Sequence, residues 1–151
     1  MTSEIAPDTA PHTEQTVLQI LDAAARLERN LDSVLSNARG VSFNEYRLLR
    51  TLALSFSGDL PRIELANSLG VTASAVTRAL KPMEKLGLIK TVKSERDARQ
   101  NRAAITTSGR ALLDDAQNVL QDYFSGLALN DLGPQEVDTL RHILSQLNIS
   151  R

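Results

Sequence analysis

The chain has 151 residues, 42% of them apolar and 23% charged, which predicts one folded domain and argues against wholesale disorder. It contains no cysteine, so the sequence excludes a disulfide framework, a thiolate metal site and a thiol redox switch. Apolar residues nowhere run for the length of about 18 that a membrane span needs, and a cytoplasmic location is the default expectation.

The formal net charge of −1 hides an uneven distribution of charge along the chain. Residues 62–102 hold nine Lys and Arg against four Asp and Glu, a local net of +5, whereas the rest of the chain carries −6. A concentrated basic patch is the electrostatic footprint of a nucleic-acid-binding surface. The middle of the chain is therefore the first place to look for function.

The N-terminal part predicts a tail followed by a long helix. Residues 1–13 contain prolines and acidic side chains without a basic stretch, which indicates a disordered tail and not a secretory signal. Apolar residues at spacings of three and four then predict an amphipathic helix over about 14–38 that ends near Gly40. Its apolar stripe is longer than a small domain can cover, so we expect part of it to pack on a partner subunit.

The middle of the chain predicts a short helix, a tight turn and a further helix. "RIELANSLG" gives a helix over about 62–68, with Pro61 near its first position and Gly70 in the turn that ends it. Its inward face would hold Ile63, Leu65, Ala66 and Leu69. "VTASAVTRALKPMEKLG" gives the next helix, with Thr72 as its N-cap and Gly87 as its terminator. Two helices joined by a Gly-containing turn form a helix-turn-helix.

After this unit the apolar period changes from helical to partly alternating. "LIKTVK" and "NRAAIT" predict the two strands of a β-hairpin, with "SERDARQ" at its tip. A helix-turn-helix followed by a two-stranded hairpin is the winged helix-turn-helix arrangement.

Three more helices frame the winged unit. One spans about 42–56 and opens with Ser42 and Glu45 at the spacing of a capping box. Thr107 caps a long helix that runs to about residue 124, and Pro134 begins the last one.

The second helix of the helix-turn-helix has two opposite faces on a helical wheel. The apolar face holds Val76, Ala79, Leu80, Met83 and Leu86. The other face holds Ser74, Thr77, Arg78, Lys81 and Lys85 and no carboxylate. Small side chains let a backbone approach DNA, hydroxyls donate to phosphates or base edges, and Arg forks onto guanine. Pro82 either kinks this helix beyond its reading end or marks its end near Lys81.

Residues 64–114 resemble the MarR family of bacterial transcriptional regulators. The motifs that carry the resemblance are "LGVTASAVTRAL", "MEKLGLI", an Asp-x-Arg in the wing and a "T-x-x-G-R-ALL" helix start. The resemblance extends more loosely to the flanking helices and implies a homodimer whose first and last helices intertwine. It also implies a palindromic operator.

The family pattern, carried onto this sequence, implies a set of DNA-binding residues. These are Arg62, Thr72, Ser74, Thr77, Arg78, Lys81, Lys93, Arg96, Asp97 and Arg99. Arg99 would be the wing-tip arginine in the minor groove, with Lys93 and Arg96 near phosphates. Asp97 would brace Arg99 or Arg78 and would not itself contact DNA. Where family members often have a hydroxyl before the turn, this chain has Pro61 and Arg62, so a phosphate contact there would come from Arg62 or a backbone amide. The role of Arg102 in DNA binding is left undecided by the sequence.

Nothing in the sequence indicates catalysis, a cofactor or a metal site. The only histidines are His12 in the tail and His142 in the last helix, and no phosphate-binding loop or nucleophile motif is present. The resembled family implies a small phenolic or otherwise lipophilic anion bound between the dimer helices and the reading head. The candidate pocket residues are Phe43, Tyr46, Arg47, Arg50 and Phe56. In the competing interpretation, the aromatic residues pack in the core and the arginines lie on a solvated face.

The sequence therefore predicts a mainly α fold. Residues 41–106 form a winged helix-turn-helix DNA-binding region with a small β-hairpin wing, and residues 14–40 and 107–151 form the helical dimerisation region. We expect a homodimeric, sequence-specific transcriptional regulator, a repressor or an activator, that binds double-stranded DNA and no membrane. The alternative is a winged-helix module that binds a protein partner and has lost DNA binding.

Overall fold

A computed structural model of the chain describes residues 10–94 and 101–147. The elements in chain order are α1 (Ala10–Arg39), α2 (Phe43–Leu54), β1 (Asp59–Pro61), α3 (Arg62–Leu69), α4 (Ala73–Lys85), β2 (Ile89–Lys93), β3 (Asn101–Ile105), α5 (Thr107–Ser125), the 3-10 helix η1 (Ala128–Asp131) and α6 (Pro134–Gln146). This is the mainly helical fold with a small sheet that the sequence predicts. Within these residues, no helix has the length and apolar character needed to cross a membrane.

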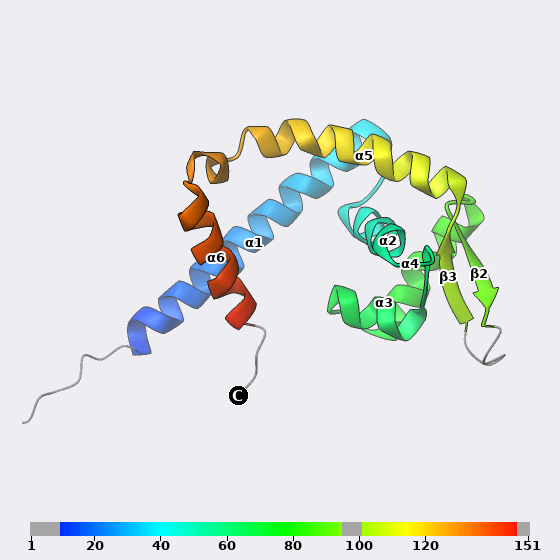
Figure 1. The fold of residues 1–151 in the computed structure, drawn as a ribbon, viewed down its shortest axis with the longest axis horizontal. Helices are drawn as coiled ribbons and strands as arrows, with labels where there is room; N and C mark the ends of the chain where they lie inside the picture. Colours follow the sequence, from blue (N-terminus) through cyan, green and yellow to red (C-terminus); the bar gives the residue numbers. More distant parts are fainter. Residues whose placement is uncertain (1–9, 95–100, 148–151) are drawn as a thin grey trace, which may run out of the picture.

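The molecule consists of a head and two long helical arms (Figure 1). The head contains α2, α3, α4 and the sheet. Helices α1 and α5 pack against each other and against α2, and both extend away from the head. Helix α6 lies at the end of α5 that is farther from the head (Figure 1).

The core lies where the head meets the inner ends of the arms. Its fully buried side chains come from α1, α2, α3, α4 and α5 and include Leu35, Leu49, Leu52, Leu65, Leu80, Met83 and Leu120. Helix α2 passes through this cluster and contacts α1, α3 and α5. The reading unit is therefore anchored to the arms through one continuous apolar core.

Helix boundaries follow the capping signals of the sequence, with some shifts. The capping box at α2 is confirmed, because the Ser42 amide donates to Glu45 Oε2 at 2.8 Å and the Glu45 amide donates to Ser42 Oγ at 3.1 Å. Helix α2 ends at Leu54, two residues before the expected end at Phe56, because the Ser55 amide and hydroxyl both bond to the Leu52 carbonyl oxygen.

Two helix starts differ from the prediction. Helix α1 begins at Ala10, so residues 10–13, expected in the tail, are helical. Helix α5 is capped by Thr106 and not by Thr107, because it is the Thr106 hydroxyl that accepts the Gly109 amide at 3.1 Å. The sequence offers two adjacent threonines, and the strand register at β3 decides which one reaches the helix.

The predicted two-stranded hairpin is part of a three-stranded antiparallel sheet in the order β1-β3-β2. Strands β2 and β3 pair as expected, with Ile89 opposite Ile105 and Lys93 opposite Asn101. The third strand, β1, pairs with β3 in the stretch between two expected helices, where the sequence predicts no strand. Because it is three residues long and ends in Pro61, it gives no alternating pattern in the sequence.

Pro82 does not end the reading helix, since α4 continues to Lys85. Beyond Pro82, the Leu86 amide donates to the Pro82 carbonyl oxygen at 3.1 Å. Two residues predicted on apolar faces are exposed: Leu86 at the end of α4 is 70% exposed, and Ile63 at the start of α3 is 57% exposed. Both lie at helix ends, where the face that a wheel assigns to the core extends beyond the packed part of the helix.

Candidate nucleic-acid interface

Helices α3 and α4 meet at a sharp turn that sets the geometry of the reading unit. Gly70 adopts φ of 66°, the left-handed conformation that glycine tolerates best, and its amide bonds back to carbonyl oxygens of α3. The Thr72 hydroxyl then accepts the Ala75 amide at 3.1 Å and caps α4. Both predicted turn residues are confirmed in these roles.

Helix α4 presents two chemically distinct faces, as its sequence predicts. Val76, Leu80 and Met83 are at most 1% exposed and fix the helix on the core. Ser74, Arg78 and Lys81 are exposed on the opposite face and Thr77 is half-buried beside them. The outward face therefore begins with hydroxyls and continues with long cations.

Glu84 is the only carboxylate of α4, and it is paired with a neighbouring strand. Its Oε1 accepts the backbone amide of Thr91 in β2 at 2.9 Å. Hydrogen bonds with Thr91 have the largest effect and lower the pKa of Glu84. Burial opposes them, and the charge of Arg62 adds a smaller lowering. No local pattern in the sequence indicates this partner of Glu84.

Arg62, predicted to contact phosphate, points toward the wing. It is the first residue of α3 and half-buried, and its Nη2 donates to the Thr91 hydroxyl at 3.0 Å. Its Nε is buried without an acceptor among the described residues. The structure thus brings Arg62 and Glu84 together at Thr91, from three different elements.

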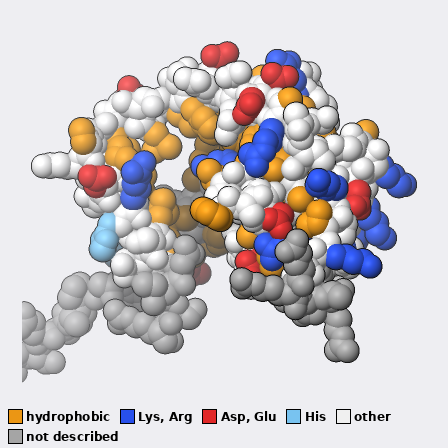
Figure 2. Space-filling model, turned by 45° about the vertical axis from the view of Figure 1, so that its right-hand side comes forward, with side chains coloured by type: hydrophobic (Ala, Val, Ile, Leu, Met, Phe, Trp, Pro, Cys, Tyr) orange, Lys and Arg blue, Asp and Glu red, His pale blue; other side chains and the backbone are white. Residues whose placement is uncertain are grey.

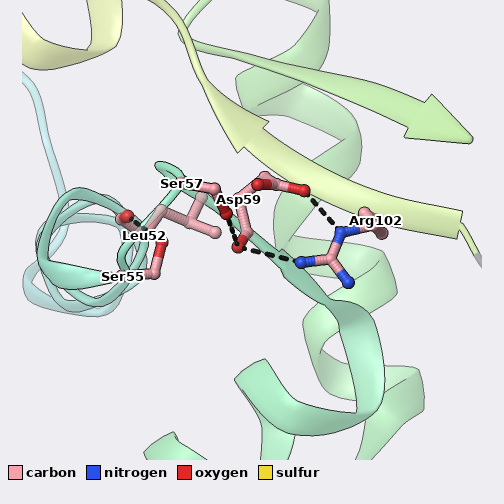
Figure 3. Close-up of polar contacts among 5 residues, drawn as sticks. All are labelled: Leu52, Ser55, Ser57, Asp59 and Arg102. Atoms are coloured by element: carbon pink, nitrogen blue, oxygen red, sulfur yellow. Dashed lines mark hydrogen bonds and ion pairs between the residues drawn. The ribbon is translucent and has the colours of Figure 1, made fainter. Parts of the chain in front are cut away.

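The base of the wing is held by an ion pair between Asp59 of β1 and Arg102 of β3 (Figure 3). Arg102 Nε donates to the Asp59 carboxylate, and Arg102 Nη2 donates to the Asp59 carbonyl oxygen at 3.3 Å. The Ser57 hydroxyl and this guanidinium lower the pKa of Asp59 more than burial raises it. Arg102, to which the sequence assigns no role, therefore joins the third strand to the hairpin.

The wing leaves the head between Lys93, exposed at the end of β2, and Asn101 at the start of β3. Three predicted DNA-binding residues, Arg96, Asp97 and Arg99, lie outside the described residues. Figure 2 shows Lys and Arg side chains gathered over the head, on the side that carries the sheet. The described part of the wing therefore rises from the basic side of the molecule.

The five candidate effector residues do not surround one cavity of the protomer. Phe43 lines an open hollow of about 670 Å³ between α1 and α2, and its ring stacks on the buried Tyr46 with centroids 6.0 Å apart. Arg47 lines a separate cavity of about 100 Å³ between α2 and α4 and donates to the Leu69 carbonyl oxygen at 3.4 Å. Arg50 is exposed on α2, and Phe56 is fully exposed after it.

The turn between α3 and α4, the two faces of α4 and the strands after it define a winged helix-turn-helix protein. The comparisons with known proteins agree with this class. A model of the MarR family matches residues 39–100. The matched segment, 62 of the 151 residues, is thus similar to the MarR family.

Known relatives and structures extend the similarity beyond the matched segment. The HTH-type transcriptional regulator PrsX of Escherichia coli is 29% identical over 100 residues, which are 66% of this chain and 60% of PrsX. The chain thus spans about 60% of the length of this relative. The structure of the transcriptional regulator BldR from Sulfolobus solfataricus has a TM-score of 0.79 at 23% identity, over 94% of this chain and 99% of BldR.

Another solved structure with this fold is Sco3205, a MarR family transcriptional regulator from Streptomyces coelicolor, in complex with DNA. Its TM-score is 0.78 at 23% identity, over 96% of this chain and 91% of Sco3205. The likeness covers the arms as well as the head. The arrangement of α1, α5 and α6 around the winged unit is therefore shared by these regulators.

Proposed function

We propose that this chain is a sequence-specific DNA-binding transcriptional regulator that acts as a homodimer on a palindromic operator. The observation that carries the proposal is the outward face of α4. Ser74 and Arg78 stand exposed there, opposite the buried Val76 and Leu80. An arginine and hydroxyls on the exposed face of a helix are the groups that read base edges in the major groove.

The DNA complex of Sco3205 supports the proposal, since a protein of the same fold binds DNA. In our proposal α4 enters the major groove with Thr72, Ser74, Thr77, Arg78 and Lys81. The wing, with Lys93, Arg96 and Arg99, reaches the adjacent minor groove and its phosphates, and Asp97 braces Arg99. The basic side of the head provides the attraction for the phosphate backbone.

The homodimer is supported by apolar side chains that a single protomer leaves uncovered. Between residues 12 and 30 of α1, only Ile20 is not exposed, although the helix carries an apolar stripe. The exposed large apolar residues of the arms are Val17, Leu18, Leu21 and Leu27 in α1, Phe124 and Leu129 in and after α5, and Ile143, Leu144 and Leu147 at the end of α6. A helix this exposed is marginal alone in water, and a second copy with the same stripes covers it best.

Release by a small anion is the finer part of the proposal. The cavity beside Arg47 lies directly behind the buried face of α4, because Ala75, Val76 and Ala79 form its wall. A lipophilic anion paired with Arg47 in this cavity displaces α4 and weakens DNA binding. Titration of the protein–DNA complex with salicylate, a phenolic carboxylate, tests it: release must occur in the wild type and be lost in Arg47→Ala.

The deciding experiment is selection of bound sequences from a random DNA pool, followed by anisotropy titration of the selected site at several salt concentrations. We expect a palindromic site with half-sites about 10 bp apart and a steep negative slope of log K against log salt. Unselective binding with a flat salt dependence would contradict the proposal and would favour a winged-helix module for a protein partner.

A further inference from the structure

Thr91 is the point at which three elements of the reading unit meet. It lies in the middle of β2, which is an edge strand because the sheet order is β1-β3-β2. Its amide is not used by the sheet and donates to Glu84 Oε1 of α4 at 2.9 Å. Its hydroxyl accepts Arg62 Nη2 of α3 at 3.0 Å.

Glu84 and Arg62 also interact with each other through their charges. The Arg62 charge contributes to the lowered pKa of Glu84, after the two hydrogen bonds from Thr91. Nε of Arg62 is buried, and its Nη2 donates to Thr91, so the guanidinium is directed at β2. The free edge of β2 is therefore bound to both helices of the helix-turn-helix through one residue.

These bonds are better suited to orientation than to stability. Glu84 and Thr91 are both exposed, and hydrogen bonds and ion pairs at exposed sites add little to the free energy of folding. They act, however, on the strand that leads to the wing: Lys93, two residues after Thr91, is the last residue of β2. A small rotation of β2 about the sheet therefore changes the direction of Lys93 relative to α4.

We propose that Arg62, Glu84 and Thr91 form a clamp that sets the angle between the wing and the reading helix α4. The three are positioning residues, and the clamp rests on the proposed function because its purpose is to present wing and α4 to DNA together. Arg62 acts on β2 and not on a phosphate. The clamp also explains why a carboxylate is present on α4, the helix proposed to bind DNA: Glu84 supplies the oxygen that accepts the Thr91 amide.

The position of the wing can be measured without DNA. The chain has no cysteine, so Lys93→Cys and Ser68→Cys, both at exposed sites, place two spin labels on β2 and α3 alone. When labelled chains are diluted into excess unlabelled protein, distances between two protomers do not contribute, and pulsed electron resonance should give one narrow distance distribution in the doubly labelled parent protein. Glu84→Ala and Arg62→Ala should broaden it, whereas Glu84→Gln, which keeps an acceptor oxygen for Thr91, should leave it narrow.

Glu64→Ala is the matched control, because Glu64 is an exposed carboxylate of α3 with no part in the clamp. A distribution that is equally narrow in Glu84→Ala and the parent overturns the clamp. Circular dichroism on every variant shows whether the fold is kept, and Arg62→Ala supplies the result if Glu84→Ala fails to fold.

DNA affinity separates the clamp from simple electrostatics. Glu84→Ala and Glu84→Gln both remove a negative charge, which by itself strengthens binding to DNA. The clamp predicts that Glu84→Ala binds the selected site about fivefold more weakly than Glu84→Gln and has a shallower salt slope, a coupling typical of neighbouring groups. Equal affinities of the two variants overturn the positioning role.

The two measurements also distinguish this proposal from the proposed function. If the unsubstituted protein binds no DNA, the proposed function fails, and with it the DNA role of the clamp. The label distances then still decide whether Arg62 and Glu84 hold β2.

Discussion

At the scale of single residues, Arg78 carries the most specific part of the proposed interface. It is exposed in the second turn of α4, past the capped end and before Pro82, and belongs to the face opposite the core. We expect Arg78→Ala to weaken binding to the selected site by about 1–3 kcal/mol and to relax selectivity at one base position.

Arg141→Ala, which removes an exposed cation from α6, is the control for a general loss of positive charge. Anisotropy titration with the selected site and with single-base variants of it gives both quantities. An equal, sequence-independent loss in the two variants would show that Arg78 contributes charge and not base recognition.

The lowered pKa of Asp59 predicts how the stability of the fold depends on pH. The Ser57 and Arg102 hydrogen bonds lower its pKa in the folded state, so in acid the unfolded chain binds the extra proton more readily. The stabilisation is complete above the ordinary carboxyl pKa of about 4 and is lost as pH falls through the lower folded value. We expect Asp59→Asn to cost about 1–2 kcal/mol at pH 7 and clearly less at pH 3.

Urea unfolding of the wild type and Asp59→Asn at both pH values tests this difference. Asp114→Asn, an exposed carboxylate of α5, is the control and should change little at either pH. If Asp59→Asn lowers the free energy of unfolding equally at pH 7 and pH 3, the charge of Asp59 does not stabilise the sheet.

At the scale of elements, the start of α5 is hydrogen-bonded to the turn that follows α4. The Thr106 hydroxyl donates to the Gly87 carbonyl oxygen at 2.6 Å and caps α5. Gly109 lies so close to β2 that a Cβ there would be 2.1 Å from the Leu88 carbonyl oxygen and 2.9 Å from Ile105 Cγ1. The arm therefore starts directly on the turn that links α4 to the wing.

We expect Gly109→Ala to force these backbones apart and to destabilise the fold by about 1–3 kcal/mol, as overpacking does in other cores. Gly126→Ala at the end of α5 is the matched control, because its Cβ would meet nothing closer than 3.6 Å and φ is −89°. Thermal unfolding of the two variants compares them, and equal midpoints would contradict the close approach.

The sequence predicts local backbone contacts of these elements but not the side-chain contacts that join distant elements. Caps and turns were predictable because Ser42, Thr72 and Gly70 act on backbone groups a few residues away. The contacts of Asp59, Glu84 and Arg62 were not, since each joins elements whose relative position no local pattern encodes. Strand β1 was missed for the same reason: its three residues become a strand only because β3 lies beside them.

At the scale of the whole molecule, charge and apolar surface are divided between head and arms. The segment 62–102 carries a net charge of +5 and the rest of the chain −6. In the proposed function, this division attracts DNA to the head and repels it from the arms, which orients its approach. The arms in turn carry most of the exposed apolar side chains, so the proposed dimer contact and the proposed DNA contact use different faces.

This division predicts that assembly can be broken without harming the head. Leu21 of α1 is 59% exposed in the protomer and lies on the apolar stripe. Burying a leucine contributes about 1.5–3 kcal/mol, and a symmetric dimer loses it twice. We expect Leu21→Glu to shift the dimer toward monomer by about two orders of magnitude or more in dissociation constant, a change that sedimentation velocity over a dilution series measures.

Leu86→Glu is the control, because Leu86 is a still more exposed leucine, at 70%, but lies on the head at the end of α4. It should leave the assembly unchanged. The Leu21→Glu monomer should keep the circular dichroism of the head while losing affinity for a two-half-site DNA more than for a single half-site, since the dimer joins two reading helices. If Leu86→Glu dissociates the dimer and Leu21→Glu does not, the dimer forms through the head and the arms are not its interface.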